Sequence, residues 1–176
     1  MLDISRHREL FDTEKFDTPI TIIGVGATGS WVALALAKLG INNINIYDFD
    51  IVEEHNIANQ AYNYSTDIGK SKVEALCNLI THNTTICPIP RNAKFTNQRL
   101  SGIVFLMVDS MKERKKIWES SIKMKSAIQL LIEPRMGLDV GRVYCVEPIN
   151  LTHIKKYEDT YYLPTQRYYI HIYLPH

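Results

Sequence analysis

The stretch ITIIGVGATGSWVALALAKLG, residues 20–40, decides the fold of this chain. Residues 20–23 are β-branched and stop at a glycine, which favours a short buried strand over a helix, since a helix needs about 10 residues or more. Residues 27–39 carry Ala and Leu on nearly every face, as in a helix packed between a sheet and another layer, and Gly40 is placed to end it. With a second strand at residues 44–48, this is a βαβ unit with parallel strands and a right-handed crossover.

The rest of the chain continues the alternation of strands and helices. We expect strands at residues 85–89 (bounded by Pro90), 103–108, 127–132 and 143–146, helices at 69–82 and 111–125, and a long functional loop at 50–68. The sequence therefore predicts an α/β fold with a Rossmann-like, doubly wound, mainly parallel sheet and helices on both faces. We expect residues 1–150 to form this domain.

Residues 151–176 predict an aromatic-rich C-terminal extension. Six of the ten tyrosines lie within residues 157–176, and residues 168–174 alternate in a way that fits an edge strand or a docking extension. We find no catalytic or binding motif in this segment.

Composition excludes several classes of protein. The 176 residues fit one domain, and a net charge of +1 leaves no basic excess for nucleic acid. No apolar run approaches the roughly 20 residues of a membrane helix, and the polar N-terminus is not a secretory signal. Cys77, Cys87 and Cys145 form no CxxC pair, which argues against a disulfide scaffold or a thiolate zinc site. We expect a cytoplasmic domain with a small-molecule site.

The first candidate site is GVGATG, residues 24–29, a GxGxxG motif placed after a strand and opening a helix. Gly24 permits the tight turn, Gly26 lets phosphate approach the backbone, and Gly29 lets the helix pack closely on the strand. Free N–H groups and the positive end of the helix dipole then hold an anion.

Asp48 adds to this motif, because it ends the second strand 24 residues after Gly24. That is near the spacing of about 20 residues at which an acid takes ribose hydroxyls. The alternative is a strand-end carboxylate that caps a turn. Together the two features predict a nucleotide, and they leave NAD and ATP open.

Four further segments follow in order: DFDIV at residues 48–52, NIANQ at 56–60, GKSK at 69–72 and DSMKER at 109–114. In this order and spacing the chain resembles the ThiF/MoeB/ubiquitin-activating superfamily. Members of that superfamily show DxDxV, Asn-x-x-Arg-Gln, a GxxK helix start, and an Asp followed five residues later by Arg. The resemblance covers about residues 5–147.

The resemblance implies that the chain binds Mg-ATP and adenylates the C-terminal glycine of a ubiquitin-like or sulfur-carrier protein. We expect no zinc site, because the chain lacks the paired CxxC motifs that many members carry. The positions that would hold the nucleotide are Gly24, Gly26, Gly29, Asp48, Asp50, Asn56, Gln60 and Lys72. Asp109 would hold Mg²⁺ and, with Lys72 and Arg6, serve catalysis. Lys72 would offset charge on phosphate oxygens.

Each of these side chains also has a structural interpretation. Lys72 fits a solvated surface charge, and Asn56 fits a turn former. Asp109 fits a cap for the helix that starts at Met111, and Arg114 fits an exposed position on a basic helix.

The N-terminal SRHR, residues 5–8, resembles the family's short basic opening segment. In the family an arginine of this segment crosses a dimer interface to reach the partner's ATP phosphates. Arg6 or Arg8 matches it as a guanidinium fork, and this implies a homodimer. A loose charged terminus is the alternative.

The chain departs from the family pattern at Asn59, where the Arg-Gln pair has its arginine. Losing a charge-assisted contact costs about 1.5–3 kcal/mol, and Arg6, Arg8 or Arg91 is available to compensate. Three functions stay open: an ATP-dependent adenylyltransferase, a noncatalytic adenylation-like partner with a degenerate ATP site, and an NAD-dependent oxidoreductase. The third leaves Asn56, Lys72 and Asp109 without roles.

Overall fold

A computed structural model describes residues 3, 9, 11–13, 15–137 and 140–161. Its elements are β1 Ile20–Ile23, α1 Gly29–Lys38, β2 Ile44–Asp48, η1 Glu54–Asn56, α2 Tyr64–Asp67, α3 Lys72–Thr84, β3 Ile89–Asn92, β4 Gly102–Leu106, α4 Met111–Ile117, η2 Trp118–Ile122, β5 Ile128–Met136, β6 Gly141–Val146 and α5 Leu151–Asp159. The βαβ unit predicted from residues 20–48 is confirmed.

The described residues form a six-stranded sheet in the order β3-β2-β1-β4-β5-β6. β1 pairs in parallel with β2 and β4, placing Ile22 opposite Ile46 on one side and Phe105 on the other. Of these six described strands, only β6 runs antiparallel, against β5. The predicted doubly wound, mainly parallel sheet is confirmed. The strand order reverses between β1 and β4, which is where ligands bind in open α/β sheets.

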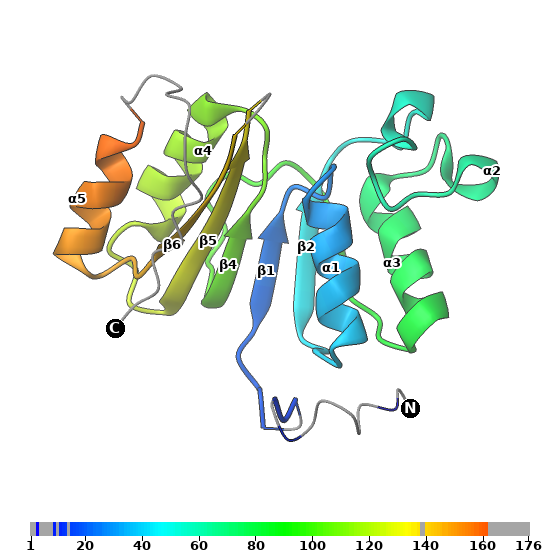
Figure 1. Ribbon diagram of the computed structural model, residues 1–176, viewed down its shortest axis with the longest axis horizontal. Helices are drawn as coiled ribbons and strands as arrows, with labels where there is room; N and C mark the ends of the chain where they lie inside the picture. The colour runs from blue at the N-terminus through cyan, green and yellow to red at the C-terminus, as the bar shows by residue number, and fades with distance from the viewer. Residues whose placement is uncertain (1–2, 4–8, 10, 14, 138–139, 162–176) are drawn as a thin grey trace.

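Helices cover both faces of the sheet (Figure 1). On one face α1 and α3 bury a cluster that includes Ala33, Leu76 and Ile80. On the other face α4, η2 and α5 bury a second cluster around Trp118 and Tyr157, whose rings meet edge to face at 4.6 Å. Burial on both sides explains why the central strands read as continuous apolar runs.

The third strand was predicted wrongly at residues 85–89, with Pro90 as its boundary. It runs from Ile89 to Asn92, so Pro90 lies inside it. β3 is the edge of the sheet and pairs only with β2 among the described residues. A proline, which lacks an N–H, is tolerated on an edge strand because one side of that strand needs no partner.

The helix predicted at residues 111–125 is divided. α4 begins after Ser110, whose Oγ accepts the Glu113 N–H at 3.4 Å. From Trp118 the backbone widens to a five-residue step, with the Lys123 N–H donating to the Trp118 carbonyl at 2.8 Å. η2 ends at Ile122, and Met124, two residues later, has a positive φ of 57°.

Other boundaries differ by smaller amounts. β4 starts at Gly102 and ends before Met107, and β5 runs past Ile132 to Met136 because β6 pairs with its whole second half. The expected loop at residues 50–68 holds the short helices η1 and α2.

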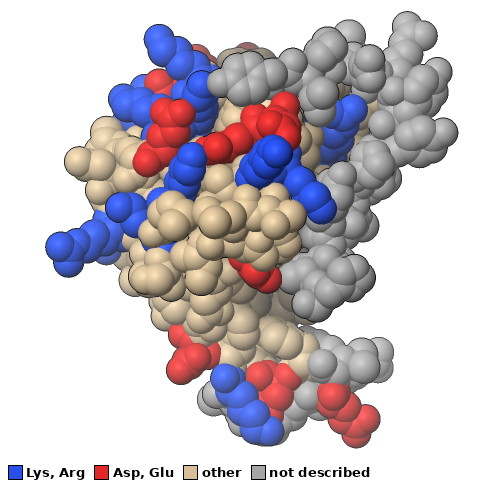
Figure 2. Space-filling view, turned by 90° about the vertical axis from the view of Figure 1, so that its left-hand side faces the viewer, with Lys and Arg blue, Asp and Glu red and all other residues tan. Residues whose placement is uncertain are grey.

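The predicted C-terminal extension contributes α5 to the fold, whereas the edge strand expected at residues 168–174 lies outside the described residues. On the α5 side of the molecule, lysines and arginines stand among aspartates and glutamates, with an uncharged area below them (Figure 2). Among the described residues, none of the helices has the length and apolar character needed to cross a membrane.

Candidate functional site

The glycine turn that follows β1 is tight at two of its three glycines. Gly24 has a φ of +92°, and a Cβ there would lie 2.9 Å from the Met107 carbonyl group. A Cβ on Gly29 would lie 2.0 Å from the Gly24 carbonyl oxygen, whereas one on Gly26 would meet nothing within 4 Å. Gly24 and Gly29 therefore close the turn, and Gly26 leaves its outer side open to a ligand.

A pocket of about 770 Å³ lies at the carboxyl ends of the parallel strands, beside this turn. Eight predicted site residues line it, namely Gly24, Gly26, Asp48, Asp50, Asn56, Gln60, Lys72 and Asp109. Gly29 does not line the pocket, and instead packs against the backbone of Gly24. The predicted Arg6 lies outside the described residues, as does Arg8. Arg91, which was considered as a substitute cation, is exposed on β3 and does not line the pocket.

Asp48 joins the two loops that border the pocket. Its Oδ2 accepts the Val25 N–H at 2.8 Å, and its Oδ1 accepts the Asp50 N–H at 2.9 Å. A carboxylate has about four lone-pair sites, so each oxygen retains capacity for a hydroxyl group from the pocket. The structural role considered for Asp48 is therefore real and leaves room for ligand binding.

Lys72 is buried, so it is not the solvated surface charge considered above. It begins α3, only 7% of it is exposed, and its Nζ lies 3.2 Å from Asp50 Oδ2. Its backbone N–H also donates to the Asp50 carbonyl at 3.0 Å. Asp50 is about half exposed, so Lys72 is a cation held at the pocket wall by a partner that can still move.

Three polar residues of the 56–60 segment occupy the wall beside α1. The buried Asn56 Oδ1 accepts the Glu53 N–H at 2.9 Å, so Asn56 is the turn former considered above and also lines the pocket. Gln60 Oε1 is buried without a hydrogen-bond partner among the described residues. Asn59 is exposed and lines the pocket, and its carbonyl accepts the Trp31 indole N–H at 3.1 Å.

Asp109 is exposed at the pocket, in the loop after β4. It does not cap α4, because Ser110 takes that position. A strand-end acid with no capping duty is available to a ligand or a cation. Asp109 lines the same pocket as Gly24 and Asp48.

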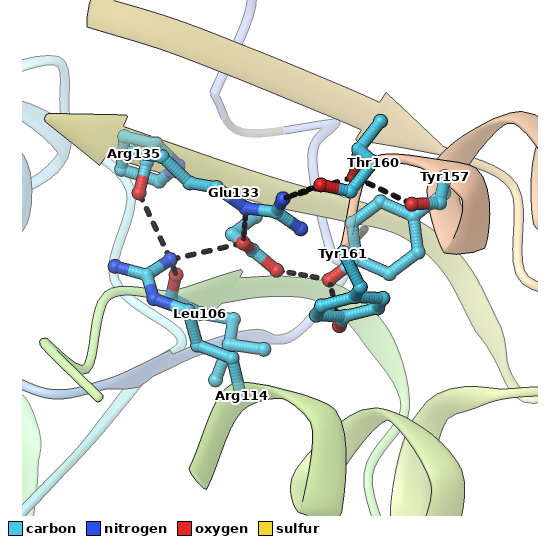
Figure 3. Close-up of polar contacts among 8 residues, drawn as sticks. Leu106, Arg114, Glu133, Arg135, Tyr157, Thr160 and Tyr161 are labelled. Atoms are coloured by element: carbon cyan, nitrogen blue, oxygen red, sulfur yellow. Dashed lines mark hydrogen bonds and ion pairs between the residues drawn. The ribbon is translucent and has the colours of Figure 1, made fainter. Parts of the chain in front are cut away.

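Arg114 is buried rather than exposed, which corrects the surface interpretation of this residue. Its Nη1 donates to the carbonyls of Leu106 at 3.2 Å and Pro134 at 2.9 Å, and lies 3.1 Å from Glu133 (Figure 3). Glu133 is wholly buried and also pairs with Arg135. Sequence reasoning missed this cluster, because the strand was predicted to end at residue 132, before Glu133 and Arg135.

The pocket mouth carries a second feature that sequence reasoning missed. Lys94, in the loop after β3, lies 3.3 Å from Glu113 on α4 and 5.9 Å from the ring centre of Phe49. Phe95 is buried against Tyr47, with the ring centres 5.3 Å apart. Aromatic rings and a cation at one rim suit a flat, electron-rich ligand group.

Burial controls the ionisation of side chains around the site. Tyr62 donates its O–H to the Val25 carbonyl at 2.7 Å. Desolvation, and then the charges of Asp48, Asp67 and Asp50, raise the pKa of Tyr62 far above its usual value. Tyr62 is therefore a neutral donor that supports the glycine turn.

Burial makes two of the cysteines poor nucleophiles. Desolvation raises the pKa of Cys77 to about 12, and burial also raises the pKa of Cys145. Cys77 donates to the Pro88 carbonyl at 3.3 Å. Cys87 is exposed and lies in the loop before β3, not in a strand as predicted. No cysteine lines the pocket.

A protein-family model described as the ThiF family matches residues 12–126. The chain belongs to the ThiF family. Molybdopterin-synthase adenylyltransferase of Escherichia coli K12 is 29% identical over 89 residues, which is 50% of this chain and 36% of that protein. The ThiF-family resemblance predicted from the sequence is confirmed.

Solved structures show the same fold. Escherichia coli MccB, crystallised with AMPCPP and MccA, matches with a TM-score of 0.63 and 20% identity over 85% of this chain and 50% of that one. The Escherichia coli tRNA N6-threonylcarbamoyladenosine dehydratase TcdA in complex with ATP matches with a TM-score of 0.56 and 25% identity over 61% of this chain and 49% of that one. This ThiF-family chain thus spans about half or less of the proteins it matches.

Proposed function

We propose that this chain binds Mg-ATP in its pocket and transfers AMP from it to the C-terminal carboxylate of a ubiquitin-like or sulfur-carrier protein. One observation carries the proposal. The glycine turn, Asp48, Lys72 and Asp109 come from separate elements and line one pocket at the switch point of the sheet. A relative whose structure was solved with ATP supports the choice of nucleotide.

The phosphates fit the side of the pocket formed by Gly26 and the start of α1. The first N–H groups of a helix have no partner within the helix, and the helix dipole favours an anion there. Asp48 accepts ribose hydroxyls with its remaining lone pairs. Lys72 exchanges Asp50 for a phosphate oxygen, which its 3.2 Å ion pair permits because Asp50 is half exposed.

The donor groups of the pocket fit Mg²⁺. Asp50 and Asp109 line it and offer hard carboxylate oxygens. Mg²⁺ is usually held by one or two carboxylates together with substrate phosphates and water. A cluster of three protein ligands is therefore not required, and none exists among the described residues. A metal held by Asp109 would screen the charge of the leaving pyrophosphate.

The proposed reaction needs no nucleophile from this chain. A carboxylate oxygen of the carrier attacks the α-phosphorus, a new O–P bond forms, and the bond to the bridging oxygen of pyrophosphate breaks. The products are an acyl adenylate and pyrophosphate. Lys72 stabilises the charge that develops on the phosphate oxygens. The burial of Cys77, with its pKa raised to about 12, agrees with a reaction that uses no thiolate here.

Asn59 is the feature that favours a second candidate, a noncatalytic partner with a degenerate ATP site. It lines the pocket where the family arginine is expected, without a charge. The structure offers Lys94 and Arg114 as other cations in the pocket lining, each held by a glutamate. A homodimer in which Arg6 reaches the partner's phosphates stays part of the proposal.

Thermal stabilisation by Mg-ATP tests nucleotide binding. Ligand at about 100 times its Kd adds about 2.7 kcal/mol, and a domain of this size gains about 2–4 °C per kcal/mol. We expect the Tm to rise by roughly 5–10 °C with Mg-ATP and not with NAD. Lys72→Ala removes the rise. Lys70→Ala is the matched control, because Lys70 is exposed two residues earlier and does not line the pocket.

Carrier-dependent exchange of labelled pyrophosphate into ATP then separates the two candidate functions. Exchange that needs a carrier with a free C-terminal carboxylate supports the adenylyltransferase. A Tm rise without exchange indicates the noncatalytic partner. A Tm rise with NAD alone rejects both and leaves the oxidoreductase.

A further inference from the structure

Glu133 is the centre of a buried cluster that links the pocket to α5. It is fully buried, and its Oε1 contacts both guanidinium groups, Nη1 of Arg114 at 3.1 Å and Nε of Arg135 (Figure 3). Its Oε2 accepts the O–H of Tyr157, a residue of α5. The carboxylate thus holds a pocket residue with one oxygen and a helix with the other.

The α5 side of the cluster is tied down by further contacts. Tyr161 donates its O–H to the Tyr157 hydroxyl at 2.8 Å. Arg135 Nη1 donates to Thr160 Oγ1 at 2.9 Å, and the Arg135 guanidinium lies over three tyrosine rings at 4.5–5.3 Å from their centres. These contacts fix Arg135, so the position of Glu133 is set from the α5 side.

The pocket side of the cluster is Arg114. Its Nη1 bridges the end of β4, at the Leu106 carbonyl, to β5, at the Pro134 carbonyl. Both Arg114 and Pro134 line the pocket. Two guanidinium charges share one carboxylate, so the cluster carries a net charge of +1 at this wall, and the Arg114 Nε has no hydrogen-bond partner among the described residues.

We propose that Tyr157 is a positioning residue for the nucleotide pocket, acting through Glu133 on Arg114. The proposal rests on the function proposed above. Glu133, Tyr157 and Thr160 all lie beyond residue 126, where the family match ends. In this chain α5 therefore supports the pocket wall indirectly, through Glu133, and removing one hydroxyl on α5 loosens the hold on Arg114, a cation that lines the pocket.

The hydroxyl matters because Glu133 is fully buried, so its carboxylate lies out of contact with bulk solvent. A buried acceptor that loses its donor bears its full desolvation cost. In Tyr157→Phe we expect Glu133 to turn towards its remaining donors, which loosens its contact with Arg114. Burial and the Glu133 charge raise the pKa of Tyr157 far above its usual value, so its proton stays on the phenol and continues to be donated.

The test compares three tyrosine-to-phenylalanine variants of the full chain. Tyr157→Phe removes the hydrogen bond to Glu133, and Tyr161→Phe removes the one that supports it. Tyr144→Phe is the matched control, because its ring also covers Arg135, at 4.5 Å, while its hydroxyl makes none of the hydrogen bonds in the cluster. Each variant is first shown to fold by its circular dichroism spectrum and Tm.

The first readout needs no ligand. In the NMR spectrum of ¹⁵N-labelled chain, the Arg114 Nε–H signal, assigned with Arg114→Lys, reports how firmly the guanidinium is held. We expect Tyr157→Phe to shift this signal and speed its hydrogen exchange, Tyr161→Phe to do so less, and Tyr144→Phe to leave it in place. An Arg114 signal that is equal in Tyr157→Phe and Tyr144→Phe overturns the proposal.

The second readout is the Kd of Mg-ATP from calorimetric titration. We expect Tyr157→Phe to weaken binding by roughly 2- to 30-fold, the range for substitutions that act without touching the ligand, and Tyr144→Phe to leave it unchanged. A Tm loss with an unchanged Kd makes Tyr157 a structural residue only and overturns the proposal. A wild-type chain that binds no nucleotide rejects the proposed function, and with it the role of Tyr157 at a nucleotide pocket, while the NMR result still decides whether Tyr157 positions Arg114.

Discussion

Two alanine substitutions in the glycine turn are predicted to have opposite effects, one on the fold and one on the ligand. A Cβ on Gly29 would stand 2.0 Å from a backbone oxygen, whereas ordinary contact begins at 3.4 Å. The turn would have to open by about 1.4 Å at a backbone atom that no side-chain rotation can move aside. Gly26 has nothing within 4 Å of its added Cβ and lines the pocket.

For Gly29→Ala we expect a loss near the upper end of the overpacking range, about 3 kcal/mol. At about 2–4 °C per kcal/mol, this lowers the Tm by roughly 6–12 °C. For Gly26→Ala the Tm without ligand changes by no more than about 2 °C, since surface substitutions stay within about 0.5 kcal/mol. In the proposed complex its methyl group would occupy the place of a phosphate oxygen, so we expect the rise of Tm with Mg-ATP to disappear.

Differential scanning calorimetry with and without Mg-ATP measures both effects in one experiment. The two variants differ from wild type by a single methyl group each, so side-chain chemistry is matched. A Gly29→Ala protein that melts with wild type, or a Gly26→Ala protein with the full Mg-ATP shift, refutes the reading of this turn.

Three further predictions concern ionisable groups. Folding keeps Cys77, Tyr62 and Tyr157 protonated, because burial raises the pKa of each above its ordinary value of 9.0 or 10.0. The free energy of unfolding that depends on these protons is complete below about pH 9 and falls as the pH rises further, by up to about 1.4 kcal/mol per pH unit for each group. Urea unfolding at pH 8 to 11 measures this loss, and a free energy of unfolding that does not change with pH contradicts the prediction. Iodoacetamide at pH 8 is expected to label the exposed Cys87 well before Cys77, whose pKa is about 12. Peptide mass spectrometry measures both labelling rates, and equal rates contradict the prediction. Glu133→Ala leaves the buried Arg114 and the partly buried Arg135 without their carboxylate, so we expect a loss of about 3–5 kcal/mol. A Tm within 2 °C of wild type, the range set by about 0.5 kcal/mol, would contradict this.

The start of the fold was predictable because its signals are local. β1, the glycine turn and α1 are contiguous in the chain, and each requirement falls on a residue that the sequence displays. The same holds for Asp48 and Asp109, since an acid at the end of a buried parallel strand is delivered to the ligand edge of the sheet. For these residues, position follows from topology.

The features that were missed depend on distant parts of the chain. Pro90 is harmless only because β3 is the sheet edge, which the sequence does not state. Arg114 was predicted to be exposed because it lies on a lysine-rich helix. It is buried because it pairs with Glu133 of β5, which in turn accepts a hydrogen bond from Tyr157 of α5. Such a buried cluster is made by strand pairing and helix packing, so no spacing within one segment announces it.

The two hydrogen bonds accepted by Asp48 also have a thermodynamic consequence. They fix the Val25 and Asp50 amides to one carboxylate, so the glycine turn and the loop after β2 form a single rigid unit. Conformational entropy that a ligand would otherwise remove has already been lost on folding. A ligand entering between these loops therefore meets a preorganised wall, and its affinity depends on the contacts it makes rather than on the ordering it imposes.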